Sequence, residues 1–129
     1  MRTRVTEQEV NELLERIQKL MDDTVNHDNN NKHCNWRYMV RLRGGKINPR
    51  SKYIAFDKYT LHDDEKESNC GVFCFLVAQN NTSVSMGSVL KGDILKPATY
   101  KAPAKYARGN IYDIHQGMDR MKWTGPHYL

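Results

Sequence analysis

Basic side chains and tyrosines alternate between Lys91 and Asn110, and this segment has the clearest chemical use in the chain. Lysine and arginine can neutralise the phosphates of a nucleic acid, and the flat ring of tyrosine can stack on its bases. The spacing therefore predicts a surface for nucleic acid or another polyanion. A solvated surface with tyrosines over the core is the alternative interpretation. The candidate residues are Lys91, Lys96, Tyr100, Lys101, Lys105, Tyr106 and Arg108.

A second basic segment lies upstream of the first. Residues 29–56 contain seven basic and no acidic residues, and they lie between two segments that are each acidic by three charges. If both basic segments share one continuous face of the folded chain, polyanion binding is favoured. The upstream candidates are Arg37, Arg41 and Arg43, which fall on one side of a predicted strand, with Lys46, Arg50 and Lys52 nearby.

Metal binding is a weaker hypothesis for this sequence. Cys70 and Cys74 form the only tightly spaced cysteine pair, in or beside a predicted strand. At about 3.3 Å per residue, that strand holds the two sulfurs about 13 Å apart. Both cannot then bind one tetrahedral zinc at a Zn–S distance of about 2.3 Å, so we expect free thiols that behave as small hydrophobes. No metal and no cofactor are expected.

Catalytic signatures give no better alternative. The sequence has no nucleophile elbow, phosphate-binding loop, paired-histidine zinc motif or dinucleotide-binding glycine motif. The acidic run Asp63–Glu67 is typical of a solvated connection, and Asp113 with His115 is a pair that occurs commonly by chance. The sequence therefore favours a non-enzymatic protein, with an unusual nucleotide- or nucleic-acid-processing site as an alternative.

Composition sets the class of protein. With 129 residues, 39% of them hydrophobic, and a formal charge of +5, the chain fits one ordinary globular domain. The longest apolar run, residues 72–78, is far shorter than the ~20 residues that cross a bilayer. Three cysteines and a polar N-terminal segment argue against a secreted disulfide scaffold. We expect a cytosolic protein without membrane contact, and the oligomeric state stays open.

The first predicted element is an amphipathic helix over residues 7–24. Thr6 and Glu9 form a capping box, and Val5 and Val10 stand where a hydrophobic staple would pack. We expect its apolar stripe to cover the protein's own sheet, with dimerisation through the stripe as the minority alternative. The polar tract over residues 26–32 predicts a loop.

Strands follow the helix. Pro97 and Pro103 exclude a regular strand or helix interior around them, so residues 97–129 are expected to form loops and short helices. The order of elements predicts an α+β domain, with the helix packed on a small antiparallel sheet of four or five strands within residues 36–96. The predicted strands are 36–43, 52–57, 71–78, of which 71–78 is central, 83–90 and 93–96, with 62–68 as an acidic connection.

The C-terminal basic segment resembles a known family. Residues 92–105, Gly-Asp-Ile-Leu-Lys-Pro-Ala-Thr-Tyr-Lys-Ala-Pro-Ala-Lys, are similar to the Gly-Asp-Val-x-Lys-x-Ala-Ser-Trp-Lys-Ala-Pro-Ala-Lys block of small bacteriophage proteins of unknown function. Thr99 and Tyr100 stand where that block has Ser and Trp. The resemblance covers roughly residues 52–129, implies a phage origin and the cytoplasm of a bacterial host, and transfers no catalytic residue.

Two classes of partner follow from these observations. The leading hypothesis is a phage accessory protein that binds nucleic acid or another polyanion through its Lys/Arg/Tyr surface. The alternative is an effector that docks the same basic surface on an acidic host protein and inhibits or redirects a host enzyme or defence complex.

Overall fold

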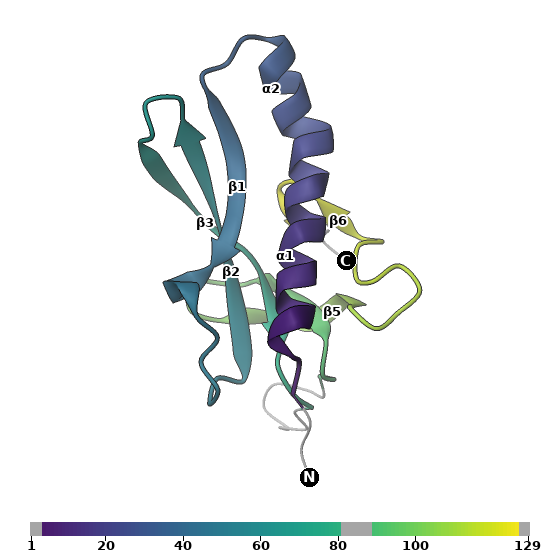
Figure 1. The fold of residues 1–129 in the computed structure, drawn as a ribbon. Helices are drawn as coiled ribbons and strands as arrows, with labels where there is room; N and C mark the ends of the chain where they lie inside the picture. The colour runs from purple at the N-terminus through teal and green to yellow at the C-terminus, as the bar shows by residue number, and fades with distance from the viewer. Residues whose placement is uncertain (1–3, 81–88, 127–129) are drawn as a thin grey trace.

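The N-terminal part of the chain is one long helix with a wider turn inside it. The computed structural model describes residues 4–80 and 89–126. Helix α1 (Glu7–Met21) continues through a π-helical turn (Asp22–Asn26) into α2 (His27–Asn31), as Figure 1 shows. Thr6 and Glu9 make the reciprocal hydrogen bonds of a capping box, and Val5 and Val10 are buried beside it. The predicted start of the helix is confirmed.

The predicted end of the helix at Thr24, and the loop predicted over residues 26–32, are wrong. The polar tract is helical as far as Asn31. Asn26 explains why: its side chain accepts a hydrogen bond from the Tyr38 N–H at 2.6 Å and donates one to the Tyr38 carbonyl at 2.8 Å. Contact with the neighbouring strand therefore outweighs the weak helix propensity of asparagine.

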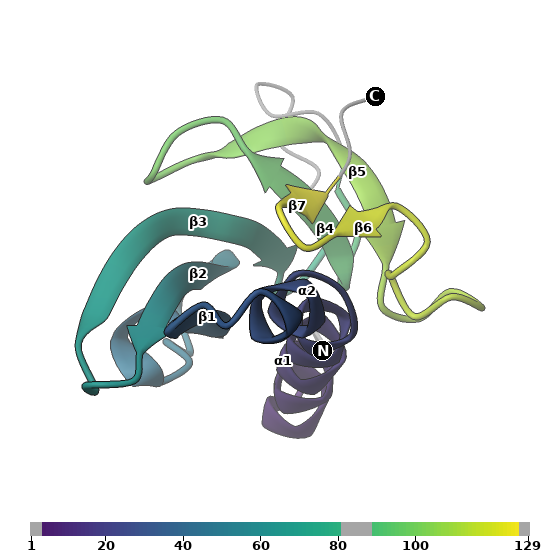
Figure 2. The ribbon, with the colours of Figure 1, turned by 90° about the horizontal axis from the view of Figure 1, so that it is seen from above.

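The strands form an antiparallel sheet in chain order, which confirms the predicted α+β class. The order is β1-β2-β3-β4-β5, so β3 is central as predicted. Figure 2 shows the sheet curving, with β1 and β2 on one side and β4 and β5 on the other. A separate hairpin, β6 (Met121–Lys122) and β7 (Gly125–Pro126), follows the sheet. The five sheet strands are β1 (Trp36–Leu42), β2 (Tyr53–His62), β3 (Glu67–Val77), β4 (Asp93–Pro97) and β5 (Pro103–Asn110).

Strand β5 corrects the expectation of loops and short helices after residue 97. The two prolines bound strands instead of excluding them, because Pro97 is the last residue of β4 and Pro103 is the first residue of β5. β2 and β3 are also longer than predicted, so the acidic connection is a short turn between His62 and Glu67. The strand predicted over 83–90 lies almost wholly outside the described residues.

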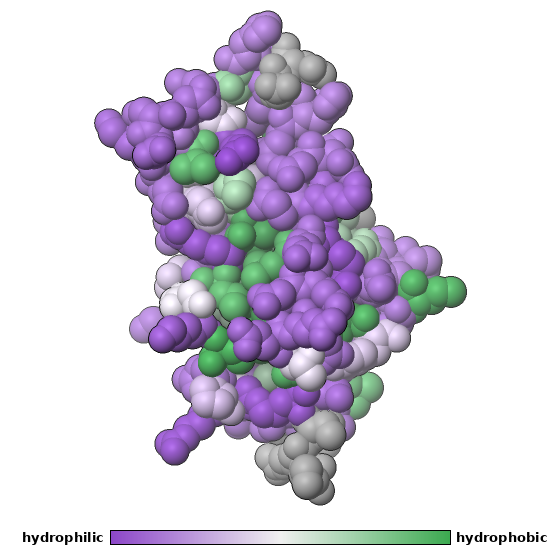
Figure 3. Space-filling view, viewed as in Figure 1, coloured by the Kyte–Doolittle hydropathy of each residue, from purple (hydrophilic) through white to green (hydrophobic). Residues whose placement is uncertain are grey.

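The sheet has two different faces. The first, the helix face, packs buried side chains such as Phe56, Leu76 and Ile94 against Leu13 and Ile17 of α1. The second, the outer face, has a smaller cluster of Phe75, Val77, Val89 and Leu95, with Tyr53 and Ala55 packed against it. Figure 3 shows a mostly hydrophilic surface over α1, with hydrophobic side chains in the seam between helix and sheet. Most of the buried apolar side chains therefore lie on the helix face, between α1 and the sheet.

Candidate nucleic-acid interface

Arg43 lies at the point where the chain leaves the sheet. Leu42, the last residue of β1, pairs with Phe56, and Arg43 follows it into a short 3-10 turn. Gly44 and Gly45 have φ angles of 75° and 74°, which glycine adopts without strain. This turn ends the pairing with β2 and leaves the Arg43 side chain free to bend toward Asp57.

Arg43 is held by two partners from different parts of the sheet. Its Nε and one terminal nitrogen donate to the two carboxylate oxygens of Asp57 at 3.1 and 2.9 Å. Its other terminal nitrogen donates to the Tyr100 carbonyl at 2.8 Å, and the guanidinium carbon lies 3.8 Å from the centre of the Tyr100 ring. The hydrogen bond to Asp57 outweighs partial burial and raises the pKa of Arg43. The two basic segments of the sequence therefore meet here.

The loop between β4 and β5, residues 98–102, is compact and brings Tyr100 and Lys101 to this place. The Ala102 carbonyl accepts the N–H groups of Ala98 and Thr99, both at 3.0 Å. The Thr99 hydroxyl accepts the N–H of Ala102 at 3.0 Å and that of Lys101 at 3.3 Å. These bonds satisfy the tip of the loop internally, so its shape does not depend on a ligand.

The resulting site is a cleft of about 260 Å³ on the outer face, here called the Arg43 cleft. Tyr53 and Phe75 contribute rings, Lys46 and Lys101 are exposed, and Arg43 lies between the cleft and Tyr100. Sequence reasoning missed Tyr53 and Phe75, because it considered aromatic residues as stacking partners only between Lys91 and Asn110. The register Ala55–Phe75 and Tyr53–Val77 makes these two rings diagonal neighbours on one face.

The other two arginines of the predicted strand lie outside the cleft. Arg41 makes an exposed ion pair with Glu67 at 2.9 Å and lies 4.0 Å from the centre of the Tyr59 ring. Arg37 lies near the start of β1, at the far end of that strand from Arg43. The structure therefore places Arg37 and Arg41 on β1, outside the cleft, and only Arg43, in the turn after β1, in the cleft.

Three further candidates are engaged elsewhere in the fold, and the first of them, Arg108, is buried and donates to the Tyr106 carbonyl. Lys96 donates to the Pro126 carbonyl at 3.0 Å, beside the C-terminal hairpin. Burial, with the nearby charges of Arg108 and Lys58, lowers the pKa of Lys96. The Lys91 nitrogen lies 5.0 Å from the centre of the Tyr112 ring, whose hydroxyl donates to Glu9 of α1 at 3.0 Å. These residues support the fold and do not line the Arg43 cleft.

The last two candidates are on β5. Tyr106 is exposed over 68% of its surface, more than Tyr100 at 52%, but it does not line the Arg43 cleft. Lys105 also belongs to β5, and its side chain lies outside the described part of the structure. Of the predicted residues, the structure brings together Arg43, Tyr100 and Lys101.

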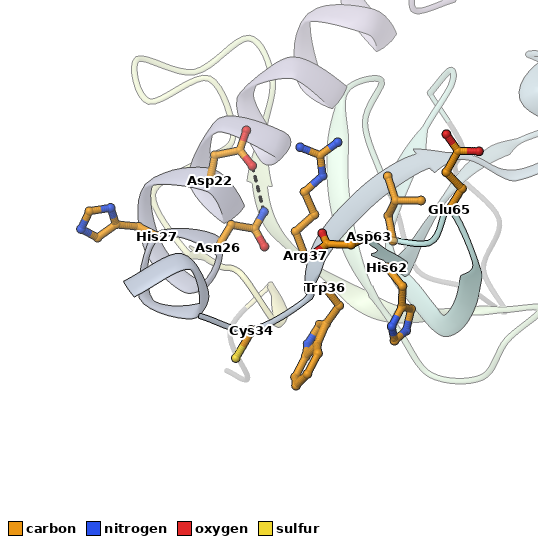
Figure 4. Close-up of a pocket in the computed structure, with 10 residues that line it drawn as sticks. Asp22, Asn26, His27, Cys34, Trp36, Arg37, His62, Asp63 and Glu65 are labelled. Atoms are coloured by element: carbon orange, nitrogen blue, oxygen red, sulfur yellow. Dashed lines mark hydrogen bonds between the residues drawn. The ribbon is translucent and has the colours of Figure 1, made fainter. Parts of the chain in front are cut away.

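A larger hollow of about 660 Å³ lies between the end of the helix and the start of β1 (Figure 4). Asp22, Arg37, Asp63 and Glu65 give it charges of both signs, and Trp36 lies beside His62 at a ring separation of 6.2 Å. Across the described ranges 4–80 and 89–126, no three His, Cys, Asp or Glu side chains are grouped to hold a metal ion. The mixed charge of this hollow suits a polyanion less well than the Arg43 cleft does.

The cysteines predicted to be free thiols have different surroundings. Cys74 is fully buried, and burial raises the pKa of its thiol far above the ordinary value. Its side chain therefore stays protonated at neutral pH and packs as a small apolar group. Cys70 is exposed on the same strand, and no disulfide links the three cysteines.

Comparison with protein-family models, curated protein sequences and solved structures gave no match for this chain. Within the described residues, no helix is long and apolar enough to cross a membrane. The functional assignment therefore rests on the geometry of the site.

Proposed function

We propose that the chain is a non-enzymatic protein that binds nucleic acid through the Arg43 cleft. One observation carries the proposal: Arg43 of the upstream basic segment contacts Tyr100 of the downstream one, and the exposed residues Lys46 and Lys101 line the cleft beside them. Cations from sequence positions more than fifty residues apart share one concave surface. This arrangement suits a chain of phosphates, which interacts with several separated charges.

The lysines and the arginine have different roles in this proposal. Asp57 compensates the charge of Arg43, so Arg43 mainly positions the Tyr100 ring. Lys46 and Lys101 are exposed and supply the charge that attracts phosphate. Affinity should therefore depend strongly on salt, because each phosphate contact releases counterions.

The origin and location of the protein are part of the same proposal. The resemblance of residues 92–105 to a bacteriophage block supports a phage accessory protein that acts in the cytoplasm of a bacterial host. Fractionation of infected cells would test this, because the protein should be found with the soluble, nuclease-sensitive material.

The experiment is a salt titration of binding to a mixed-sequence DNA oligonucleotide, followed by fluorescence anisotropy. The double variant Lys46→Gln/Lys101→Gln removes two cleft charges at exposed side chains. We expect its affinity at low salt to fall about tenfold, and the slope of log K against log salt to decrease by about 1.4 for single-stranded DNA.

Lys66→Gln is the matched control. Lys66 is 83% exposed in the turn between β2 and β3, at the opposite end of that hairpin from Tyr53. Its variant should bind like the wild type. A change in log K for Lys66→Gln half as large as that for the double variant, which removes two charges and not one, would mean that net charge, and not the Arg43 cleft, determines binding. Wild-type affinity that does not change with salt would contradict the proposal outright.

A further inference from the structure

The shape of the Arg43 cleft restricts the kind of nucleic acid it can accept. Its basic side chains, Arg43, Lys46 and Lys101, line a recess of about 260 Å³ and do not belong to a protruding helix or ribbon. Duplex DNA is read by a helix or ribbon that enters a groove, and its bases are stacked inside. A single strand can instead turn one base outward into a recess.

Rings are available at this recess for such a base. Tyr53 and Phe75 line it, and Phe75 is covered except for 3% of its surface, so Phe75 forms part of the floor. Tyr100 has one ring face near the Arg43 guanidinium and is 52% exposed. A base that stacks on a tyrosine ring contributes about 1–3 kcal/mol, with little dependence on sequence.

The hydrogen bonds of Arg43 leave some of its capacity for a ligand. The guanidinium has five N–H donors. Three of them are directed at Asp57 and Tyr100. Because Asp57 and the Tyr100 carbonyl fix the guanidinium plane, its remaining donors have defined directions. The β4–β5 loop is also closed by its own hydrogen bonds, which reduces the ordering that binding requires.

Building on the proposed function, we infer that the Arg43 cleft selects single-stranded nucleic acid. One unstacked base enters the recess lined by Tyr53 and Phe75, beside the Arg43–Tyr100 pair, and Lys46 and Lys101 bind the phosphates on either side of it. Selectivity for a single strand then comes from the rings, whereas attraction to any polyanion comes from the lysines.

Three probes separate these two contributions: a 12-nucleotide single-stranded DNA, a hairpin duplex containing the same sequence, and inorganic polyphosphate, which has charge but no bases. All three compete for the labelled single strand at one fixed low salt concentration. We expect the single strand to bind at least tenfold more tightly than either competitor. A duplex or polyphosphate that competes equally well would overturn the inference but would leave polyanion binding intact.

Variants in which one tyrosine ring is replaced by leucine give a second test, with affinity for the single strand and for polyphosphate as the readout. Tyr53→Leu removes a ring that lines the recess and should weaken single-strand binding about tenfold but change polyphosphate binding less than twofold, because only the base loses its stacking partner. Tyr106→Leu, on β5 and outside the cleft, is the matched control and should leave both affinities unchanged. Equal effects of Tyr53→Leu on both probes would contradict the inference.

A third measurement does not depend on variants. Single-stranded DNA with 5-bromouracil substituted along its length should crosslink on irradiation, and mass spectrometry should locate the crosslinks at Tyr53 or Tyr100. Crosslinks found only outside residues 43–55, 75 and 98–102 would exclude a base in the Arg43 cleft. If none of the three probes binds at low salt, the proposed function itself fails, and this result is distinct from loss of single-strand selectivity.

Discussion

Basic residues occur on both faces of the sheet, but their surroundings differ. On the helix face, Lys58 lies 5.7 Å from the centre of the Trp123 ring, and Lys96 is hydrogen-bonded to the C-terminal hairpin. On the outer face, Lys46 and Lys101 are exposed at the Arg43 cleft. Burial lowers the pKa of Lys58 and of Lys96, so the fold bears a desolvation penalty for these charges. The exposed lysines keep their hydration until a ligand arrives.

The apolar side chains also differ between the two faces, because more of them are buried on the helix face than on the outer face. The helix face packs large buried residues from α1 and from four of the strands, whereas the outer-face cluster is small. Stability is therefore concentrated on the helix face, and the outer face can contain charges and exposed rings. A face that contributes less to folding can be specialised for binding.

The largest expected effect is on the helix face. Leu13→Ala removes a fully buried side chain of α1 and should lower the free energy of unfolding by about 3 kcal/mol. Leu14→Ala makes the same change one position along the helix, where the side chain is only half-buried, and should lower it by about 1 kcal/mol. Urea denaturation measures both values. Equal losses would show that the helix does not pack through the face described.

The next effect tests whether an outer-face residue also supports the fold. Arg43→Met leaves Asp57, 8% exposed, without its cation and should lower the free energy of unfolding by about 2 kcal/mol. Arg41→Met breaks the exposed pair with Glu67 and should lower it by less than about 0.5 kcal/mol. Thermal unfolding of both variants gives the comparison. A loss at Arg41 as large as at Arg43 would contradict the role assigned to burial of Asp57.

A smaller effect concerns the edge of the sheet that lies beside the helix. Asn26→Ala removes both hydrogen bonds to the Tyr38 backbone and should lower the free energy of unfolding by about 1 kcal/mol. Hydrogen exchange should show faster exchange of the Tyr38 N–H in particular. Gln8→Ala, which removes only an exposed contact with Glu12, is the control and should leave the Tyr38 amide unchanged. Unaltered exchange in both variants would refute the assigned contact.

The smallest expected effect distinguishes the partly buried Lys58 from the exposed Lys46, and pH is the variable that tests it. Because burial lowers the folded-state pKa of Lys58, its charged form opposes folding at neutral pH. Lys58→Met should therefore raise the free energy of unfolding by about 0.5–1 kcal/mol at pH 7. This gain should shrink as the pH rises from the lowered folded-state pKa toward the unfolded value near 10.4, because the unfolded lysine then also loses its proton.

Lys46→Met supplies the comparison for the outer face. Lys46 is exposed, so its replacement should leave stability unchanged. Chemical denaturation at pH 7, 8.5 and 10 measures both lysine variants. A gain at Lys58 that stays constant over this range would mean that desolvation of the charge is not its cause.

Local signals in the sequence predicted much of the fold. The capping box located the helix start, and the apolar run 71–78 correctly indicated the central strand of the sheet. The missed features depend on tertiary contacts. The Asn-rich tract is helical because Asn26 bonds to β1, and Pro103 fits in β5 because it is that strand's first residue.

For the candidate site, the sequence predicted individual residues but not their contacts. Arg43, Tyr100 and Lys101 could be identified from charge and aromatic spacing, because those properties are written in the sequence. Their contact could not be identified, since it depends on the curvature of the sheet and on the path of the β4–β5 loop. Asp57, which fixes Arg43, stands at the end of the predicted strand 52–57, and no local pattern in the sequence pairs it with Arg43. The sequence shows which residues have suitable chemistry, and curvature decides which of them meet.

The contact between helix and sheet edge has a consequence for strand alignment. The Gln18 side chain accepts a hydrogen bond from the Val40 N–H at 3.0 Å and donates one to the Tyr38 carbonyl at 3.1 Å. The Asn26 side chain accepts from the Tyr38 N–H and donates to the Tyr38 carbonyl. Two amides eight positions apart on the helix are thus matched to residues two apart on β1. The wider π turn keeps Gln18, Asp22 and Asn26 in line, and Asp22 accepts from both amides.

A strand that slips by one residue exchanges its buried and exposed side chains. Since a slipped β1 would present different backbone groups to Gln18 and Asn26, the helix selects a single alignment of the edge strand. Deleting one residue within Asp22–Asn26 should therefore weaken that selection even where the helix itself remains intact.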